Sequence, residues 1–191
     1  RSREPHQIEP AAGRIIYDVG GMFDAERGIF DHHQRPNPLR QDGQPYSSFG
    51  LIWAHYGRDY LMSFNVPSRD VDAIHASFDR GFVLPVDLID NGAVNPSDAG
   101  PLFASLILPV LLETLKPVFD DRKDGADDRA FAAALPVARA FIEASIQRKA
   151  AKLRAEALVS DAIEKAGTSA VLELPMGMPF RAGIEKAGAD H

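Results

Sequence analysis

Cysteine is absent from this sequence of 191 residues. Its absence excludes disulfide bonds, zinc–thiolate sites, iron–sulfur clusters and cysteine nucleophiles. Long apolar runs are missing as well, because the longest candidate, residues 102–112, is broken by Pro109 and is shorter than the roughly 20 residues that cross a bilayer. The opening residues, Arg1 to Pro5, do not resemble a secretory signal. We therefore expect a cytoplasmic protein that makes no contact with membranes.

Positive charge is also scarce, since 21 Lys and Arg stand against 27 Asp and Glu and the formal net charge is −6. A protein that coats nucleic acid is usually basic. An enzyme that grips a few phosphates at a metal site need not be basic, because the bound cation supplies the local positive charge. The charge balance therefore argues against broad nucleic-acid binding and leaves phosphoester chemistry open.

The hydropathy and charge patterns divide the chain into three parts. Residues 1–120 read as one domain of helices and strands whose N-terminal part is missing. Residues 121–166 read as a charged linker followed by a long helix at about 129–166, which ends at a glycine. Residues 167–191 read as the start of a truncated second domain, with a strand at 170–174.

Two amphipathic helices are expected within the first domain. One opens at Ser47 and Ser48 and stops at Gly57, and the other covers residues 69–90. The stretch 102–119 is apolar almost all round, so we expect it to be buried, either within the domain or in a contact between subunits of a homodimer.

Carboxylates and imidazoles gather around one short stretch, Asp31-His32-His33. Asp18 precedes it and follows the apolar run 15–17, which has the composition of a short buried strand. In open α/β sheets, ligands bind outside the carboxyl ends of strands. A carboxylate at a strand end, followed shortly by an acid and two histidines, is typical of a metal site.

Further acids follow at Asp87 and Asp90, which share one face if their segment is helical. Carboxylates near a helix C-terminus are disfavoured by the helix dipole, so their presence suggests a nearby cation. The mixture of carboxylate and imidazole suits Mn²⁺ or Mg²⁺. The alternatives are a turn carboxylate at Asp18, structural histidines and tolerated surface acids.

Candidate substrate contacts lie in the loop after the histidines and at the helix that follows it. Arg35 could meet an anionic substrate, whereas Arg40 reads as a solvated loop charge. Ser47 and Ser48 could seat a phosphate at the positive end of the helix. A role as the helix N-cap is the favoured alternative for a serine at this position.

Taken together, these motifs closely resemble the melanocyte-proliferating-gene family, a group of metal-dependent hydrolases related to the Asp-His-His phosphoesterases. The resemblance covers about residues 1–165 and rests on four runs: Asp18-Val19-Gly20-Gly21, Phe30-Asp31-His32-His33-Gln34-Arg35, Ser47-Ser48-Phe49-Gly50-Leu51-Ile52 and Asp87-Leu88-Ile89-Asp90-Asn91-Gly92. It implies an α/β fold in which a parallel-sheet, phosphoesterase-like domain is followed by a long helix and the start of a second α/β domain.

The resemblance also implies an activity, a 3′-to-5′ exonuclease-like phosphodiesterase that acts on RNA or short oligonucleotides through two metal ions. Matched position by position, four residues correspond to metal ligands: Asp18, His32, Asp90 and, less directly, Asp87. His33 matches the histidine that faces the scissile phosphate, with Arg35 assisting. Asp31 is expected to orient its neighbours from behind the ligands. The implied cofactor is Mn²⁺, with Mg²⁺ as the alternative.

One departure from the family pattern concerns its first motif, Thr-His-x-Gly-x-Phe-His-x-Asp, which would precede Arg1 and supply further ligands. We therefore expect an internal fragment that is inactive alone. Two other functions stay open. One is a pyrophosphatase or small-molecule phosphatase of the same superfamily, and the other is a non-catalytic, metal-stabilised dimeric scaffold.

Overall fold

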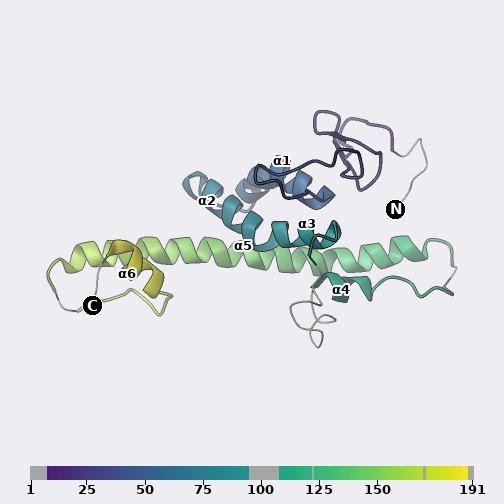
Figure 1. Cartoon of the computed structure of the whole chain (residues 1–191). Helices are drawn as coiled ribbons and strands as arrows, with labels where there is room; N and C mark the ends of the chain where they lie inside the picture. The colour runs from purple at the N-terminus through teal and green to yellow at the C-terminus, as the bar shows by residue number, and fades with distance from the viewer. Residues whose placement is uncertain (1–7, 95–107, 122, 170, 189–191) are drawn as a thin grey trace.

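A computed structural model describes residues 8–94, 108–121, 123–169 and 171–188. A small sheet and the helices between residues 48 and 90 lie along one side of a single long helix, residues 126–166 (Figure 1). In chain order the elements are β1 Ile16–Tyr17, β2 Phe23–Asp24, β3 Ile29–Phe30, α1 Ser48–Ser63, α2 Ser68–Phe78, the π-helical η2 Asp79–Val83, α3 Leu84–Asp90, α4 Leu108–Glu113, α5 Ala126–Ala166 and α6 Arg181–Ala187. Within these described ranges, no helix combines the length and apolarity that crossing a bilayer requires.

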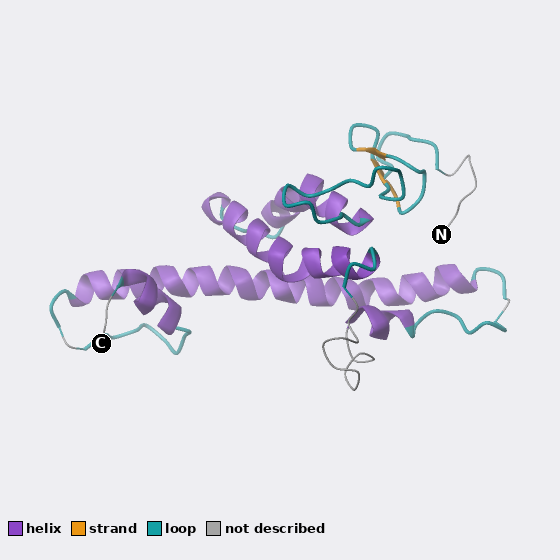
Figure 2. Cartoon of the chain, viewed as in Figure 1, coloured by secondary structure: helices purple, strands orange, loops and turns teal. Residues whose placement is uncertain are grey.

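The sheet has the strand order β1-β3-β2 and is mixed rather than parallel (Figure 2). β1 pairs with β3 in parallel, while β2 and β3 form an antiparallel hairpin. The connection from Asp24 to Ile29 is too short for a parallel crossover, which needs a dozen or more residues. The presence of a sheet together with helices confirms the α/β class, but within the described residues the expected parallel pairing is present only between β1 and β3.

Helix α1 begins where the sequence predicted and runs past the predicted stop at Gly57. Gly57 is buried, and a Cβ atom there would collide with Trp53 and His75. The imidazole of His75 stacks on the indole of Trp53 with ring centroids 4.9 Å apart. Gly57 therefore allows α2 to approach α1 closely, and the prediction that it ends the helix is wrong.

The segment predicted as one helix over residues 69–90 is interrupted by the π turn of η2. The amide of Leu84 donates to the carbonyl of Asp79, five residues earlier. Pro85 follows at once; it has no N–H to donate, and its ring would clash with a carbonyl in a regular α-helix. A wider π turn relieves such crowding, which explains why the interruption lies here.

The core lies between α1, α2, η2 and the middle of α5. Its buried members are Trp53, Leu61, Val66, Val71, Ile74, Phe78, Val83, Ile146 and Ala150. α5 starts three residues before the predicted helix and ends at the predicted residue, with Pro136 inside it. Ile146 and Ala150 therefore join the long helix to the core of the preceding helices.

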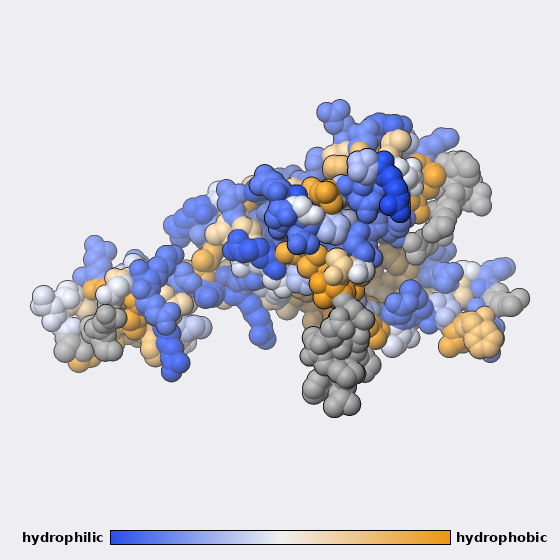
Figure 3. Space-filling view, viewed as in Figure 1, coloured by the Kyte–Doolittle hydropathy of each residue, from blue (hydrophilic) through white to orange (hydrophobic). Residues whose placement is uncertain are grey.

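The structure bears on two predictions for the C-terminal half. Residues 171–174 are irregular rather than a strand, since the described sheet contains only β1, β2 and β3; residue 170 lies outside the described residues. Val118 and Phe119 of the apolar stretch 102–119 are 67% and 94% exposed in the single chain, so they are not buried within the domain. Burial of this stretch in a contact between subunits stays a prediction, and residues 102–107 lie outside the described ranges. On the face shown in Figure 3, apolar surface is visible near both ends of α5 and also at the middle of the molecule.

Candidate metal site

Two neighbouring strands end at the same edge of the sheet and deliver the first site residues there. Tyr17 of β1 lies opposite Phe30 of β3 in the parallel register. Asp18 and Asp31 follow these two residues, so both leave the sheet at its carboxyl edge, where open α/β sheets bind ligands. Phe30 is fully buried beneath the edge, which fixes the direction in which the chain leaves β3.

Asp18 adopts a left-handed backbone conformation, with φ of 59°. Asp and Asn visit this region more readily than most residues. Its amide donates to the Ser48 hydroxyl at 3.1 Å and to the carbonyl of Phe30 at 3.3 Å. The first residue of α1 and the end of β3 therefore hold the turn that presents the Asp18 carboxylate.

His32 is buried and held at both ring nitrogens. Nδ1 lies 3.1 Å from the carbonyl oxygen of Tyr46. A carbonyl can only accept, so Nδ1 must carry the proton. Nε2 then faces two carboxylates, 3.4 Å from Asp90 Oδ2 and 3.9 Å from Asp18 Oδ1. Three electron-rich atoms that face one another in this way need a proton or a cation between them.

Asp31 holds the ring of His33 from behind. One of its carboxylate oxygens accepts from His33 Nδ1 at 2.6 Å and from the His33 amide at 3.2 Å, and the other accepts from the Gly21 amide at 2.6 Å. Burial alone would raise the pKa of Asp31, but the hydrogen bonds from His33 and Gly21 outweigh it and lower the pKa. Asp31 is thus a charged carboxylate that orients an exposed imidazole.

These groups fit a divalent cation. Asp18, His32 and His33 each offer one ligand atom, and the three atoms lie within 4.8 Å of one another. Two atoms that each lie about 2.1 Å from one Mg²⁺ are at most about 4.2 Å apart. The distances from His32 Nε2 to the carboxylates of Asp18 and Asp90 are within this limit. His33, the third group of the cluster, needs only a small movement to meet it.

Asp90 completes the ring of acids around His32 from the end of α3. Burial raises the pKa of Asp90; nearby His32 lowers it, and the neighbouring Asp18 carboxylate raises it again, with a net rise above its usual value. Two carboxylates that share one imidazole therefore disfavour each other's charge. A bound cation would relieve that repulsion, as a metal site requires.

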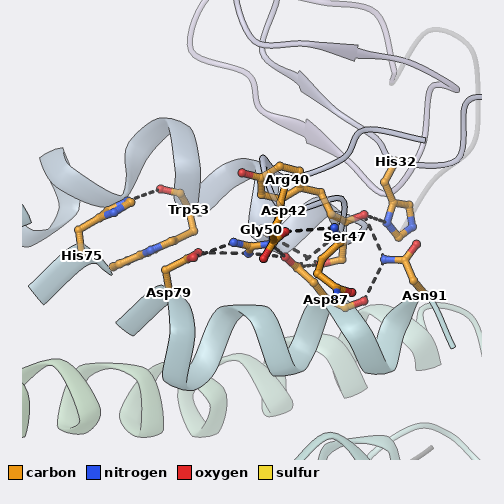
Figure 4. A network of polar contacts seen from close by, with 12 residues as sticks. His32, Arg40, Asp42, Ser47, Gly50, Trp53, His75, Asp79, Asp87 and Asn91 are labelled. Atoms are coloured by element: carbon orange, nitrogen blue, oxygen red, sulfur yellow. Dashed lines mark hydrogen bonds and ion pairs between the residues drawn. The ribbon is translucent and has the colours of Figure 1, made fainter. Parts of the chain in front are cut away.

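Asp87 does not face the other candidate metal ligands, although the family resemblance matched it to a ligand position. It is fully buried, and protein donors occupy both of its oxygens. Oδ1 accepts from the Ser47 amide at 3.2 Å and hydroxyl at 2.6 Å, while Oδ2 accepts from Arg40 Nη2 at 2.6 Å and Nε at 3.1 Å. Figure 4 shows this network beside His32.

Arg40 is an anchor within this network rather than the solvated loop charge that the sequence suggested. Its side chain is 9% exposed and also pairs with Asp79 of η2 at 2.7 Å. Its guanidinium lies 4.5 Å from the centre of the Tyr46 ring, a cation–π distance. Arg40 ties the loop that follows the histidines to η2 and α3. Its partners lie about 40 residues away in sequence, so no local sequence pattern indicated these ion pairs.

The two serines expected to seat a phosphate are buried and bonded to protein. The Ser47 hydroxyl caps α1 by accepting from the Gly50 amide at 3.4 Å, which confirms the favoured alternative. The Ser48 hydroxyl holds the backbone of Asp18. Arg35, in contrast, is exposed in the loop after the histidines, where it is accessible to an anionic ligand.

Asn91 is the member of the site whose role the sequence did not reveal. Its side-chain amide donates to the Tyr46 carbonyl at 3.1 Å and to the Asp87 carbonyl at 2.9 Å. The carbonyl of Tyr46 thus accepts hydrogen bonds from both Asn91 and His32. A backbone acceptor leaves no mark in a sequence pattern, so only the position of Asn91, next to Asp90, could have suggested this contact.

Together, the fold and the site define an α/β protein with a cluster of carboxylate and imidazole suited to a divalent cation. Residues 1–189 match the model of a family described as an uncharacterised protein family (UPF0160) and labelled as an exonuclease family of the MYG1 type. The chain belongs to this family.

Relatives in the same family come from distant eukaryotes. The MYG1 protein of Saccharomyces cerevisiae is 31% identical over 95% of this chain and 58% of its own length. The MYG1 exonuclease of Rattus norvegicus is 29% identical over 85% of this chain and 45% of its own, and that of Homo sapiens is 32% identical over 54% and 30%. The chain thus spans between 30% and 58% of the length of these relatives. No solved structure matches it significantly.

Proposed function

We propose that this chain carries part of the active site of a metal-dependent phosphoester hydrolase, an exonuclease-like phosphodiesterase. The observation that carries the proposal is the placement of His32, whose Nδ1 is bound by a carbonyl and whose Nε2 faces Asp18 and Asp90. An imidazole fixed through one nitrogen, with the other turned towards carboxylates, is the usual arrangement of a metal-ligating histidine.

Asp18, His32 and Asp90 would hold the cation, and His33 is close enough to join them. A bound Mn²⁺ or Mg²⁺ supplies an activated water and neutralises phosphate charge. Asp31 keeps the His33 ring pointing towards the cluster. Exposed Arg35 extends the positive field to the side from which an anionic substrate approaches. A two-metal form would need ligands beyond those brought together in the described residues.

The substrate class follows from the relatives. Two of them are named MYG1 exonuclease, which supports a nucleic acid and its phosphodiester bonds as the substrate here. The net charge of −6 argues for local recognition of a strand end rather than for a long basic track. We propose RNA or a short oligonucleotide, hydrolysed from its 3′ end.

Metal binding can be tested on this chain directly. Titration of Mn²⁺, followed by the loss of its free electron-paramagnetic-resonance signal, is expected to show binding that His32→Ala and Asp18→Asn each weaken at least tenfold. His55→Ala is the matched control, because His55 is exposed on α1 and its ring lies against the rings of Phe30 and Tyr56. Equal Mn²⁺ binding by His32→Ala and the wild type would refute the site.

Hydrolysis is tested separately, with a panel of RNA, oligonucleotide, pyrophosphate and phosphomonoester substrates. The comparison pairs this chain with a longer form that spans the full length of the relatives. Turnover of RNA by the longer form, lost in His32→Ala, would support the proposal. Turnover of pyrophosphate alone would favour the small-molecule alternative.

A further inference from the structure

One peptide group, between Tyr46 and Ser47, is held at both ends by site residues. Its carbonyl oxygen accepts from His32 Nδ1 and from the side-chain amide of Asn91, each at 3.1 Å. Its N–H donates to the buried carboxylate of Asp87 at 3.2 Å. Because a peptide group is planar, the donor at one end and the acceptor at the other cannot be turned independently.

This arrangement links Asp87 to His32 through the backbone. The carboxylate at the N–H end fixes the plane of the peptide and polarises it, which strengthens its carbonyl as an acceptor. A stronger and fixed acceptor favours the tautomer of His32 that carries its proton on Nδ1. The same tautomer leaves Nε2 bare towards Asp18 and Asp90, as a cation requires.

Asp87 itself is set in place from several sides. Arg40 neutralises its charge, with contacts of 2.6 and 3.1 Å, and shares the remaining positive charge with Asp79. Gly50 lies so close that a Cβ atom there would collide with the Asp87 carboxylate. The Asp87 carboxylate is thus buried, paired and sterically confined, so it is fixed in position and is not available as a metal ligand.

The π turn of η2 makes this pairing possible. Asp79 and Asp87 are eight residues apart, and a regular α-helix would place them roughly 80° apart around its axis. A π turn rotates less per residue, which brings the two carboxylates closer to one face, where a single guanidinium reaches both.

We propose that Asp87 is a positioning residue that acts through the Tyr46–Ser47 peptide and selects the metal-binding tautomer of His32. The cation in this statement rests on the proposed function. The tautomer does not, because it is a property of the metal-free chain and is measured without any substrate.

The first measurement is the ¹⁵N spectrum of the imidazoles in the metal-free wild-type chain, at a pH where the ring of His32 is neutral. The inference requires His32 to be in the Nδ1–H tautomer and the Ser47 amide to be protected from exchange. A His32 in the Nε2–H form, or a Ser47 amide that exchanges as fast as an exposed loop, overturns the inference without any variant.

The second measurement uses Asp87→Asn, which keeps the shape of the side chain and removes its charge. We expect His32 to populate both tautomers and Mn²⁺ affinity to fall on the order of tenfold. The matched control is Asp72→Asn, whose carboxylate is exposed and paired with Arg58 on the surface. It should leave both the tautomer and the affinity unchanged.

The outcomes separate the two proposals. A folded Asp87→Asn chain with the wild-type tautomer refutes the positioning role, whatever its metal affinity. A wild-type chain with the Nδ1–H tautomer that binds no Mn²⁺ supports the positioning of His32 and refutes the proposed function. If Asp87→Asn does not fold, the wild-type tautomer and the Ser47 amide decide the question.

Discussion

The region around the sheet and helices α1 to α3 differs sharply from the ends of the long helix α5. The first region buries large side chains and charged groups together, including Phe30, Phe78 and Asp87. Along α5 only Ile146, Ala150, Ala155 and Val159 are buried, while larger apolar side chains stay exposed: Phe131, Leu135, Val137, Phe141 and Leu158.

The difference shows which part of the chain is fixed in one geometry by tertiary contacts. Buried charges tolerate few arrangements, because each needs its partner at the right distance. The region with the candidate metal site is therefore held in one geometry by its own contacts. α5 makes its main contacts with other helices at its middle, against α2, and near its C-terminus, against α6. A helix supported in this way depends on local propensity elsewhere along its length.

The largest expected effect contrasts two phenylalanines. Phe78→Ala removes a fully buried ring from the core and should lower the free energy of unfolding by about 4 kcal/mol. Phe119→Ala, at a side chain that is 94% exposed, should change it by less than about 0.5 kcal/mol. Urea unfolding followed by circular dichroism measures both. Similar losses in the two variants would contradict the proposed contrast between the regions.

The second effect concerns the buried charges. Arg40→Met leaves the carboxylate of Asp87 buried without its cation and should cost about 3 kcal/mol of unfolding free energy. Arg58→Met removes the exposed partner of Asp72 and should cost less than about 1 kcal/mol. The same urea titration applies. A loss of less than about 1 kcal/mol in Arg40→Met would show that the network contributes little.

The third effect depends on pH. The pKa of Asp31 is lower in the folded chain than its usual value of 3.8. Its contribution is therefore fully present above pH 3.8 and is lost as the pH falls through the folded pKa. Asp31→Asn should cost roughly 2 kcal/mol at pH 6, and less at pH 3. A cost that stays constant between these pH values would contradict the assigned hydrogen bonds.

The smallest effect is expected on the exposed face of α5. Leu135→Ala removes an apolar side chain that is 54% exposed, and alanine is the better helix former. The free energy of unfolding should change by less than about 0.5 kcal/mol. Ile146→Ala, on the buried face of the same helix, is the comparison and should cost about 3 kcal/mol. A large loss in Leu135→Ala would reveal a contact of this face in solution, such as a dimer.

The sequence pattern predicted the parts of the site that depend on local order. Asp18 and the histidines follow strands, and strands that pair in parallel bring their carboxyl ends together. The proximity of Asp18 and His32 could therefore be predicted from the residues, as could the cap at Ser47, whereas Asp90 was expected beside them from the family resemblance. The long helix was equally accessible, because its periodicity and its terminal glycine are local signals.

The sequence could not reveal contacts that join distant segments through charge or backbone atoms. Arg40 looked like a loop charge because Asp79 and Asp87 lie far along the chain. Gly57 looked like a helix end, although close packing against Trp53 and His75 explains it. The strand expected at 170–174 failed for a related reason, since a strand needs a partner and periodicity cannot supply one.

The π turn of η2 has a consequence for how the chain tolerates insertions and deletions. A π turn holds one residue more than the α-helical turn that it replaces, so deleting one residue between Asp79 and Val83 would restore regular helical spacing and leave α3 close to its present rotation. Inserting one residue there would instead rotate α3 by about 100°, and Asp87, Asp90 and Asn91 would turn away together from the loop that carries the histidines. The alignment of the candidate metal site thus depends on the length of a segment to which none of the candidate ligands belongs, and a deletion there is expected to be better tolerated than an insertion.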